Sequence, residues 1–295
     1  MKLVYSPLYV VDIGEHVFPT SKFGLVAEAL RGQGDFLEPE PASREQLLLA
    51  HDPDWVDKVL KGRLSLDEQM LIELPMTPAV VAAHRAAVCG TILACRLALE
   101  QGVGLHVGGG SHHAFADHGE GFCVFNDIAS GILAMFSERR ISRASVIDLD
   151  VHHGNGTASI FSSMPDVFTF SVHQDGIYPE LRPPSSLDIG LPVGVEDGPY
   201  LRLLADNLDR AFEHQPELVV YQAGVDSYER DLLGGLKLTA QGLKRRDEAV
   251  FEACRRRGVP VAVTLGGGYA SRLSETASLH AQTLLAFAPG GKILK

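Results

Sequence analysis

The residue types that could do chemistry are concentrated where short apolar runs end. The apolar stretch Ala144–Leu149 leads directly into Asp150, and His152 follows two positions later. At the end of an extended strand, side chains two residues apart point to the same side. A second apolar stretch ends in the same way at Asp226. Two carboxylates and one imidazole with an open coordination position are typical of a catalytic zinc or iron site.

Two adjacent histidines, His112 and His113, follow a run of three glycines. On such a loop both imidazoles can face one pocket, one as a general base and the other as its electrostatic partner. A second run, Gly266–Gly268, precedes Tyr269 and would deliver a phenol that can donate to a developing oxyanion. The spacing of a phosphate-binding loop does not follow this run, so phosphate binding is disfavoured.

Two further segments place an aromatic side chain close to a glycine. Phe122 follows Gly121, and Tyr178 follows Gly176 at one remove. Aromatic residues in turns often do no more than cover the core. Beside the acid and histidine clusters, they could instead form two walls of a narrow tube.

The elements that must position these residues alternate in type along the chain. Short apolar runs alternate with longer segments of helical periodicity, which predicts an α/β fold with one open parallel sheet covered by helices on both faces. The predicted strands are Lys2–Tyr5, Gly104–Gly108, Ala144–Asp148, Val167–Val172, Leu218–Gln222 and Pro260–Leu265. The predicted helices are Phe23–Leu30, Arg44–Ala50, Pro53–Lys61, Pro78–Glu100, Asp127–Arg139, Tyr200–Glu213, Ala240–Arg257 and Ser274–Phe287. Nearly all of the polar clusters fall at the carboxyl ends of strands, where such sheets bind ligands.

The composition predicts one large domain over residues 1–295, because no linker, charge block or repeat divides the chain. With 26 basic and 37 acidic residues and no basic stripe, direct nucleic-acid binding is not expected, and a basic peptide partner is compatible with the charge. Four scattered cysteines in apolar surroundings predict reduced, buried thiols in a cytoplasmic protein: Cys89, Cys95, Cys123 and Cys254. We expect neither a signal peptide nor an apolar run of membrane-spanning length.

Taken together, these residues make the chain resemble the histone deacetylase superfamily, which has the arginase/deacetylase fold. The matching segments are Gly109–Ala114, Gly121–Asn126, Asp148–Gly156, Gly176–Pro179, Gly224–Asp226, Asp231–Gly235 and Gly266–Tyr269. Their forms look closest to class IV members and their bacterial relatives.

The resemblance implies a metal site and a catalytic group. Zn2+, or Fe2+ in its place, would bind to Asp150, His152 and Asp226. The residues that would transfer protons, or orient those that do, are His112, His113, Asp148, Asn155 and Tyr269. In this scheme His113 is the base, His112 assists and is oriented by Asp148, and Tyr269 donates to the oxyanion. Asn155 stands where many members carry an aspartate partner for the second histidine.

The resemblance also implies substrate and potassium contacts. An acyl-lysine channel would be formed by Gly121, Phe122, Tyr178, Leu233 and Gly267. Tyr178 here replaces the commoner phenylalanine, and Glu73 is the candidate for the acid at the rim. A structural K+ would be bound by Asp148, Asp150, His152, Ser171 and Val172, and a second K+ in part by the backbone of Phe161, Met164 and Val167.

The leading hypothesis is a zinc-dependent hydrolase that removes acyl groups, acetyl first among them, from lysine side chains of proteins. One alternative is a deacetylase of small acetylated amines such as polyamines, and another is a protein that binds acyl-lysine without catalysis. The related arginases use two manganese ions and need further aspartates, whereas here Asp226 is followed by Ser227 and Tyr228. The sequence leaves the acyl length and the oligomeric state open.

Overall fold

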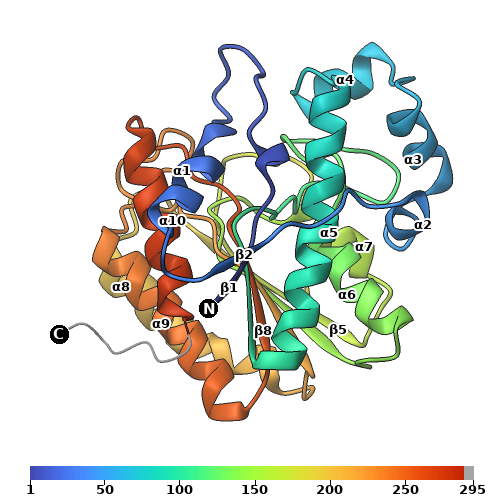
Figure 1. The fold of residues 1–295 in the computed structure, drawn as a ribbon. Helices are drawn as coiled ribbons and strands as arrows, with labels where there is room; N and C mark the ends of the chain where they lie inside the picture. Colours follow the sequence, from blue (N-terminus) through green and yellow to red (C-terminus); the bar gives the residue numbers. More distant parts are fainter. Residues whose placement is uncertain (289–295) are drawn as a thin grey trace.

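One sheet forms the centre of the molecule. The computed structural model describes residues 1–288, and its eight strands are all parallel to their neighbours in the order β2-β1-β3-β8-β7-β4-β5-β6. The strands are β1 (Lys2–Val4), β2 (Asp35–Leu37), β3 (Val103–His106), β4 (Ala144–Asp148), β5 (Val167–Gln174), β6 (Leu187–Leu191), β7 (Leu218–Gln222) and β8 (Val261–Thr264). The predicted open parallel α/β fold is therefore confirmed (Figure 1).

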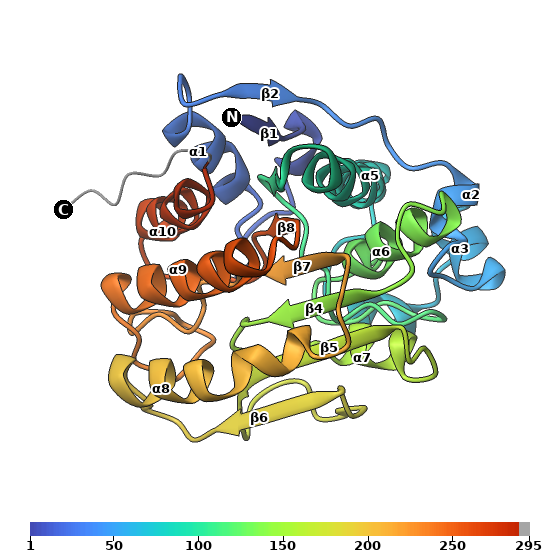
Figure 2. The same ribbon diagram turned by 90° about the horizontal axis from the view of Figure 1, so that it is seen from below.

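Helices cover both faces of this sheet, and Figure 2 shows the three layers from below. One face carries α1 (Ser21–Ala29), α8 (Asp197–Asn207), α9 (Ala240–Arg257) and α10 (Leu273–Ala286). The other face carries α2 (Arg44–Leu47), α3 (Pro53–Leu60), α4 (Leu66–Ile72), α5 (Pro78–Gln101), α6 (Asp127–Ser137) and α7 (Asn155–Phe161). Two short 3-10 helices are η1 (Pro7–Tyr9) and η2 (Leu208–Phe212).

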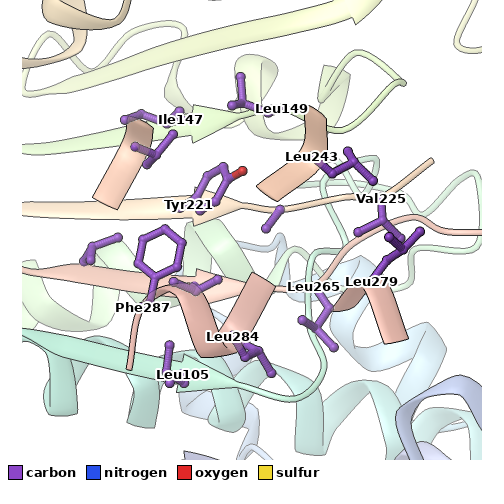
Figure 3. Close-up of a cluster of buried hydrophobic side chains, with 14 of the residues drawn as sticks. Leu105, Ile147, Leu149, Tyr221, Val225, Leu243, Leu265, Leu279, Leu284 and Phe287 are labelled. Carbon is purple, nitrogen blue, oxygen red and sulfur yellow. The ribbon is translucent and has the colours of Figure 1, made fainter. Parts of the chain in front are cut away.

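The hydrophobic core consists of two clusters, one on each face of the sheet. Successive residues of a central strand point to opposite faces, so Val146 of β4 joins the cluster under α5 and α6 while Ile147 joins the cluster under α9 and α10. In the cluster under α9 and α10, the ring centroids of Tyr221 and Phe287 lie 5.6 Å apart (Figure 3). Strands that are buried on both faces are what the continuous apolar runs predict.

The ends of α9 and the start of α3 illustrate how local residues set helix boundaries. Thr239 caps α9, since its side chain accepts from the backbone N–H of Gly242, and Gly258 ends that helix at a φ of 65°. Pro53 occupies the first position of α3, where a missing N–H costs no hydrogen bond within the helix. Asp52 is the residue before it, but its side chain makes no capping hydrogen bond.

Two strands, two α-helices and the 3-10 helix η1 were not predicted. β2 and β6 are the two edge strands, and they are short or partly exposed rather than continuous apolar runs. α4 and α7 have seven residues each. The segment predicted as one helix over 200–213 is instead α8, which begins at Asp197, followed by η2.

The expectation that no apolar run reaches membrane-spanning length was wrong for α5. By length and composition this 24-residue helix could cross a membrane, since its most apolar window has a mean hydropathy of 1.5. In the structure 56% of that window is buried inside the protein, and the helix packs against α6 and β3. A core helix of this kind satisfies the same criteria as a membrane span, so the finding is weak evidence for one.

Candidate functional site

The three proposed metal ligands lie together at the carboxyl ends of two neighbouring strands. Asp150 and His152 follow β4, Asp226 follows β7, and these strands are adjacent with Asp148 opposite Gln222. The Nδ1 atom of His152 lies 3.1 Å from Oδ1 of Asp150 and 3.1 Å from Oδ2 of Asp226. All three side chains are buried, and their ligand atoms lie within 4.8 Å of one another.

The electrostatics of this cluster fit a cation. Burial, followed by the charge of Asp150, raises the pKa of Asp226 to about 7. Burial alone would lower the pKa of His152, but its hydrogen bonds to Asp150 and Asp226 raise it to about 10. A proton and a divalent metal compete for the same imidazole lone pair, and the metal requires the deprotonated ligand. The donor set of two oxygens and one nitrogen suits Zn2+ or Fe2+.

The glycine loop after β8 closes around these carboxylates. The backbone N–H of Gly267 donates to Oδ2 of Asp150 at 2.8 Å. A side chain at position 267 would overlap the carboxylate of Asp226, so only glycine fits there. The carboxylate of Asp226 also accepts from the backbone N–H of Val151 at 2.8 Å. Gly267, predicted as a substrate contact, thus also supports the proposed ligands.

The two histidines have different partners. Nδ1 of His112 lies 2.7 Å from Oδ2 of Asp148, and Nδ1 of His113 lies 2.8 Å from Oδ1 of Asn155. Burial lowers the pKa of His112, but the charges of Asp148 and Asp150 raise it to about 9. Burial and the neighbouring imidazole of His112 lower the pKa of His113 well below its usual value. The surroundings thus shift the pKa values of the two imidazoles in opposite directions, although their ring centroids are 4.1 Å apart.

Tyr269 lies in the same pocket as the two histidines. Burial, followed by the charges of Asp226 and Asp150, raises the pKa of its phenol well above 10. The hydroxyl therefore stays protonated and remains a hydrogen-bond donor at neutral pH. Its backbone N–H donates to Oδ2 of Asp231 at 2.7 Å.

The pocket contains part of the predicted channel. Of the predicted channel residues, Gly121, Phe122 and Gly267 line it. Tyr178 is not among the lining residues of the described chain, but the centroid of its ring is 4.9 Å from that of His113, and 39% of the residue is exposed. Leu233 is half-buried and is not among the residues that line the pocket within the described part of the chain.

Within the described part of the chain, the remaining predicted residues do not line the pocket: Ser171, Val172, Phe161, Met164, Val167 and Glu73. In the proposed potassium site, Ser171 of β5 is paired with Asp148 of β4, and its hydroxyl lies 2.9 Å from Nδ1 of His173. The carbonyls of Phe161 and Met164 accept from the N–H groups of residues 164 and 167 in a tight turn. Glu73 is exposed at the end of α4, with its carbonyl 2.7 Å from Nε2 of His16.

Several residues that hold the site together were not found from the sequence. Buried Asp127 accepts from the backbone N–H groups of Gly110 and Ser111 and so fixes the histidine loop. Lys22 of α1 is fully buried, and its ammonium donates to the carbonyl of Gly266 at 2.8 Å. Burial lowers the pKa of this lysine to about 8. Asp127 and Lys22 contact residues that are 16 to 244 positions away in the sequence, so no local motif identifies either of them.

Comparison with known proteins agrees with this geometry. The histone deacetylase domain model matches residues 16–285. An uncharacterized protein of Picosynechococcus sp. is 41% identical over 94% of this chain and 95% of its own length. Histone deacetylase 2 of Arabidopsis thaliana is 34% identical over 91% of this chain and 74% of its own length. The acetoin utilization protein AcuC of Bacillus subtilis is 32% identical over 80% of this chain and 68% of its own length.

A solved structure has the same fold. The crystal structure of the HDA15 HD domain superposes with a TM-score of 0.79 over 99% of this chain and 89% of that chain, at 22% identity. The family model and the curated relatives each span most of the chain. The chain therefore belongs to the histone deacetylase family, a family of hydrolases.

Proposed function

We propose that the protein is a zinc-dependent hydrolase that removes acyl groups, acetyl first among them, from lysine side chains of proteins. The observation that carries this proposal is one pocket in which Asp150, His152, a neutral His113 and a protonated Tyr269 meet. These are the groups that hydrolysis of an unactivated amide needs: a metal site, a general base and an oxyanion donor.

Each residue has a step that its surroundings favour. Zn2+ held by Asp150, His152 and Asp226 would supply a Lewis acid that acidifies water and polarises the amide carbonyl. His113, neutral because it is buried, takes a proton from the attacking water and returns it to the leaving lysine amine. Tyr269 donates to the carbonyl oxygen as negative charge develops there.

The remaining residues position these groups and the substrate. Asp148 accepts from His112, which lies against the base with ring centroids 4.1 Å apart and can act as its electrostatic partner. Phe122 lines the pocket and the ring of Tyr178 lies beside that of His113, so both are proposed to contact the apolar stem of an acyl-lysine. We further propose that Asp148 and Ser171 take part in a structural K+ site, together with backbone carbonyls of Asp150, His152 and Val172.

The metal is tested with Asp226→Ala, using exposed Asp209→Ala as the control. We expect Asp226→Ala to lose bound zinc and activity together. In the wild type, zinc at 100 to 1,000 times its dissociation constant should stabilise the fold by roughly 3–4 kcal/mol, and the variant should lose this gain. Metal analysis, turnover and thermal unfolding measure these effects. An active Asp226→Ala protein with full metal occupancy would contradict the assignment.

The substrate is tested with acyl-lysine peptides from acetyl to long chains, alongside acetylated polyamines. Higher kcat/KM on peptides supports the proposal, and higher kcat/KM on polyamines would favour the small-amine alternative. Binding of acyl-lysine peptide without turnover in the zinc-loaded protein would favour a non-catalytic reader.

A further inference from the structure

Glu120 lies behind the proposed base and has no role in the steps above. Its Oε1 accepts from Nδ2 of Asn155 at 2.5 Å and from the hydroxyl of Tyr178 at 2.8 Å. Its other oxygen, Oε2, lies 3.6 Å from Nε2 of His118. Burial raises the pKa of this carboxyl, but hydrogen bonds from His118, Asn155 and Tyr178 together lower it below its usual value. One carboxylate thus contacts the partner of the base and the wall of the channel.

These contacts allow only one orientation of the Asn155 amide. Its Nδ2 donates to Glu120 and to the carbonyl of Leu181 at 3.3 Å, while its Oδ1 accepts from the N–H of Gly156 at 3.0 Å. In the flipped amide, Oδ1 would face a carboxylate and a carbonyl, and the NH2 group would face an N–H. Unpaired donors and acceptors in a buried site cost free energy, so the flipped state is disfavoured.

The amide orientation in turn decides the tautomer of His113. With Oδ1 of Asn155 at 2.8 Å, Nδ1 of His113 must carry the proton. Nε2 then keeps its lone pair, and this is the nitrogen that can accept a proton from water. The chain of contacts runs from Glu120 through Asn155 to His113.

We propose that Glu120 is a positioning residue that sets the tautomer of the base through Asn155 and holds Tyr178 against it. This proposal rests on the proposed function for its catalytic meaning, but not for its geometry. A carboxylate in direct contact with the imidazole would favour the imidazolium. Placing the amide between them gives Glu120 control of orientation while the base stays neutral.

Two variants at this position separate geometry from charge. Glu120→Ala removes the acceptor. Glu120→Gln keeps an oxygen that can accept from both Asn155 and Tyr178, and its NH2 group can donate to His118. Asp117→Asn is the control, since this exposed acid contacts the other nitrogen of His118 at 2.7 Å. Metal content and thermal unfolding show whether each variant is folded and loaded.

The primary measurement is 15N NMR of histidine-labelled, zinc-loaded protein without substrate, with His113 assigned from a His113→Ala sample. We expect wild type, Glu120→Gln and Asp117→Asn to show the Nδ1–H tautomer of His113. Glu120→Ala should show a mixture of tautomers, with kcat on the order of threefold to tenfold lower, the population change that one hydrogen bond controls.

An unchanged tautomer in Glu120→Ala would overturn the proposal, whatever its kcat. So would a Glu120→Gln protein that behaves like Glu120→Ala, because the acceptor would then not be the cause. If the wild type hydrolyses no acyl-lysine, the proposed function fails, but the NMR comparison still decides the role of Glu120.

Discussion

At the scale of single residues, burial keeps the hydroxyl of Tyr269 protonated and therefore able to donate a hydrogen bond. A phenol whose pKa lies well above 10 donates a hydrogen bond at every pH at which the enzyme would work. Tyr269→Phe should keep its metal but lose about 10²–10³-fold in kcat, the usual effect of removing one oxyanion donor. Steady-state kinetics with metal analysis check this. A changed KM with unchanged kcat would mean that the phenol does not act in the transition state.

Asn155 offers a second test at this scale, through pH. An aspartate at position 155 would favour the imidazolium and raise the pKa of His113 by roughly one unit or more, from Coulomb's law at about 4 Å. The base must be neutral, so activity is lost below its pKa. The acidic limb of the kcat/KM profile of Asn155→Asp should therefore move to higher pH.

Glu120 adds a condition to that test, since an aspartate at 155 would face a second carboxylate. Two carboxylates in contact do not both ionise readily, which weakens the effect of the substitution. Combining Asn155→Asp with Glu120→Gln removes this repulsion and should give the larger shift. A limb that stays in place in both proteins would show that residue 155 does not tune the base.

The sequence predicted the residues of the pocket better than those behind it. Asp150, His152 and Tyr269 lie in short runs with glycines at strand ends, where residue type and spacing alone suggest chemistry. Asp127 and Glu120 are single acids whose partners come from other elements. Such contacts exist only after folding, and no local periodicity predicts them. The roles assigned to the pocket residues stay predictions until they are measured.

At the scale of elements, α9 is tied to the ends of the ligand-bearing strands. Buried Arg246 donates to the carbonyls of Leu149 and Gly224 at 3.2 and 2.6 Å and to Oδ1 of Asp247 at 2.8 Å. Arg246→Met would leave Asp247 as an uncompensated buried charge, which typically costs about 3–5 kcal/mol. Arg255→Met on the same helix is the matched control, because its contact with Glu252 is exposed.

Denaturant unfolding of the two variants measures this difference. Arg246→Met should be far less stable than Arg255→Met, which should resemble the wild type. Equal stability of the two variants would show that the buried arginine does not hold α9 to the sheet. We also expect Arg246→Met to lose bound zinc. The carbonyls that Arg246 holds belong to residues 149 and 224, which lie one and two positions before the proposed ligands Asp150 and Asp226.

The central strands could be predicted because strands that are buried on both faces consist largely of apolar residues. β4 and β7 are mostly apolar and are buried at every position, and both were predicted with their observed bounds. β6 alternates between half-buried and exposed positions, so it gives no continuous apolar run. α4 was missed although Ser65 and Glu68 form a capping box, a local signal that could have identified it.

At the scale of the whole molecule, the order of the strands could not be predicted from local patterns. β7 and β8 are the last two strands in the sequence, yet they lie between β3 and β4 in the sheet. In a parallel sheet, the residues of a strand do not identify which other strand lies beside it. The rule that ligands bind at the carboxyl edge, together with the family resemblance, allowed a site to be proposed without the strand order.

That order has a consequence for how the protein is made. While the ribosome has released only the first 210 residues, β2-β1-β3 and β4-β5-β6 are two separate half-sheets with no strand between them. The strands that join them, and Asp226, Gly267 and Tyr269 with them, emerge last. The exposed edge strands of such half-sheets have unpaired backbone N–H and C=O groups, which can pair with a strand of the wrong partner. The nascent chain must therefore keep two apolar edges apart until β7 and β8 are available, and the proposed catalytic centre forms in the same event that joins the two halves of the sheet.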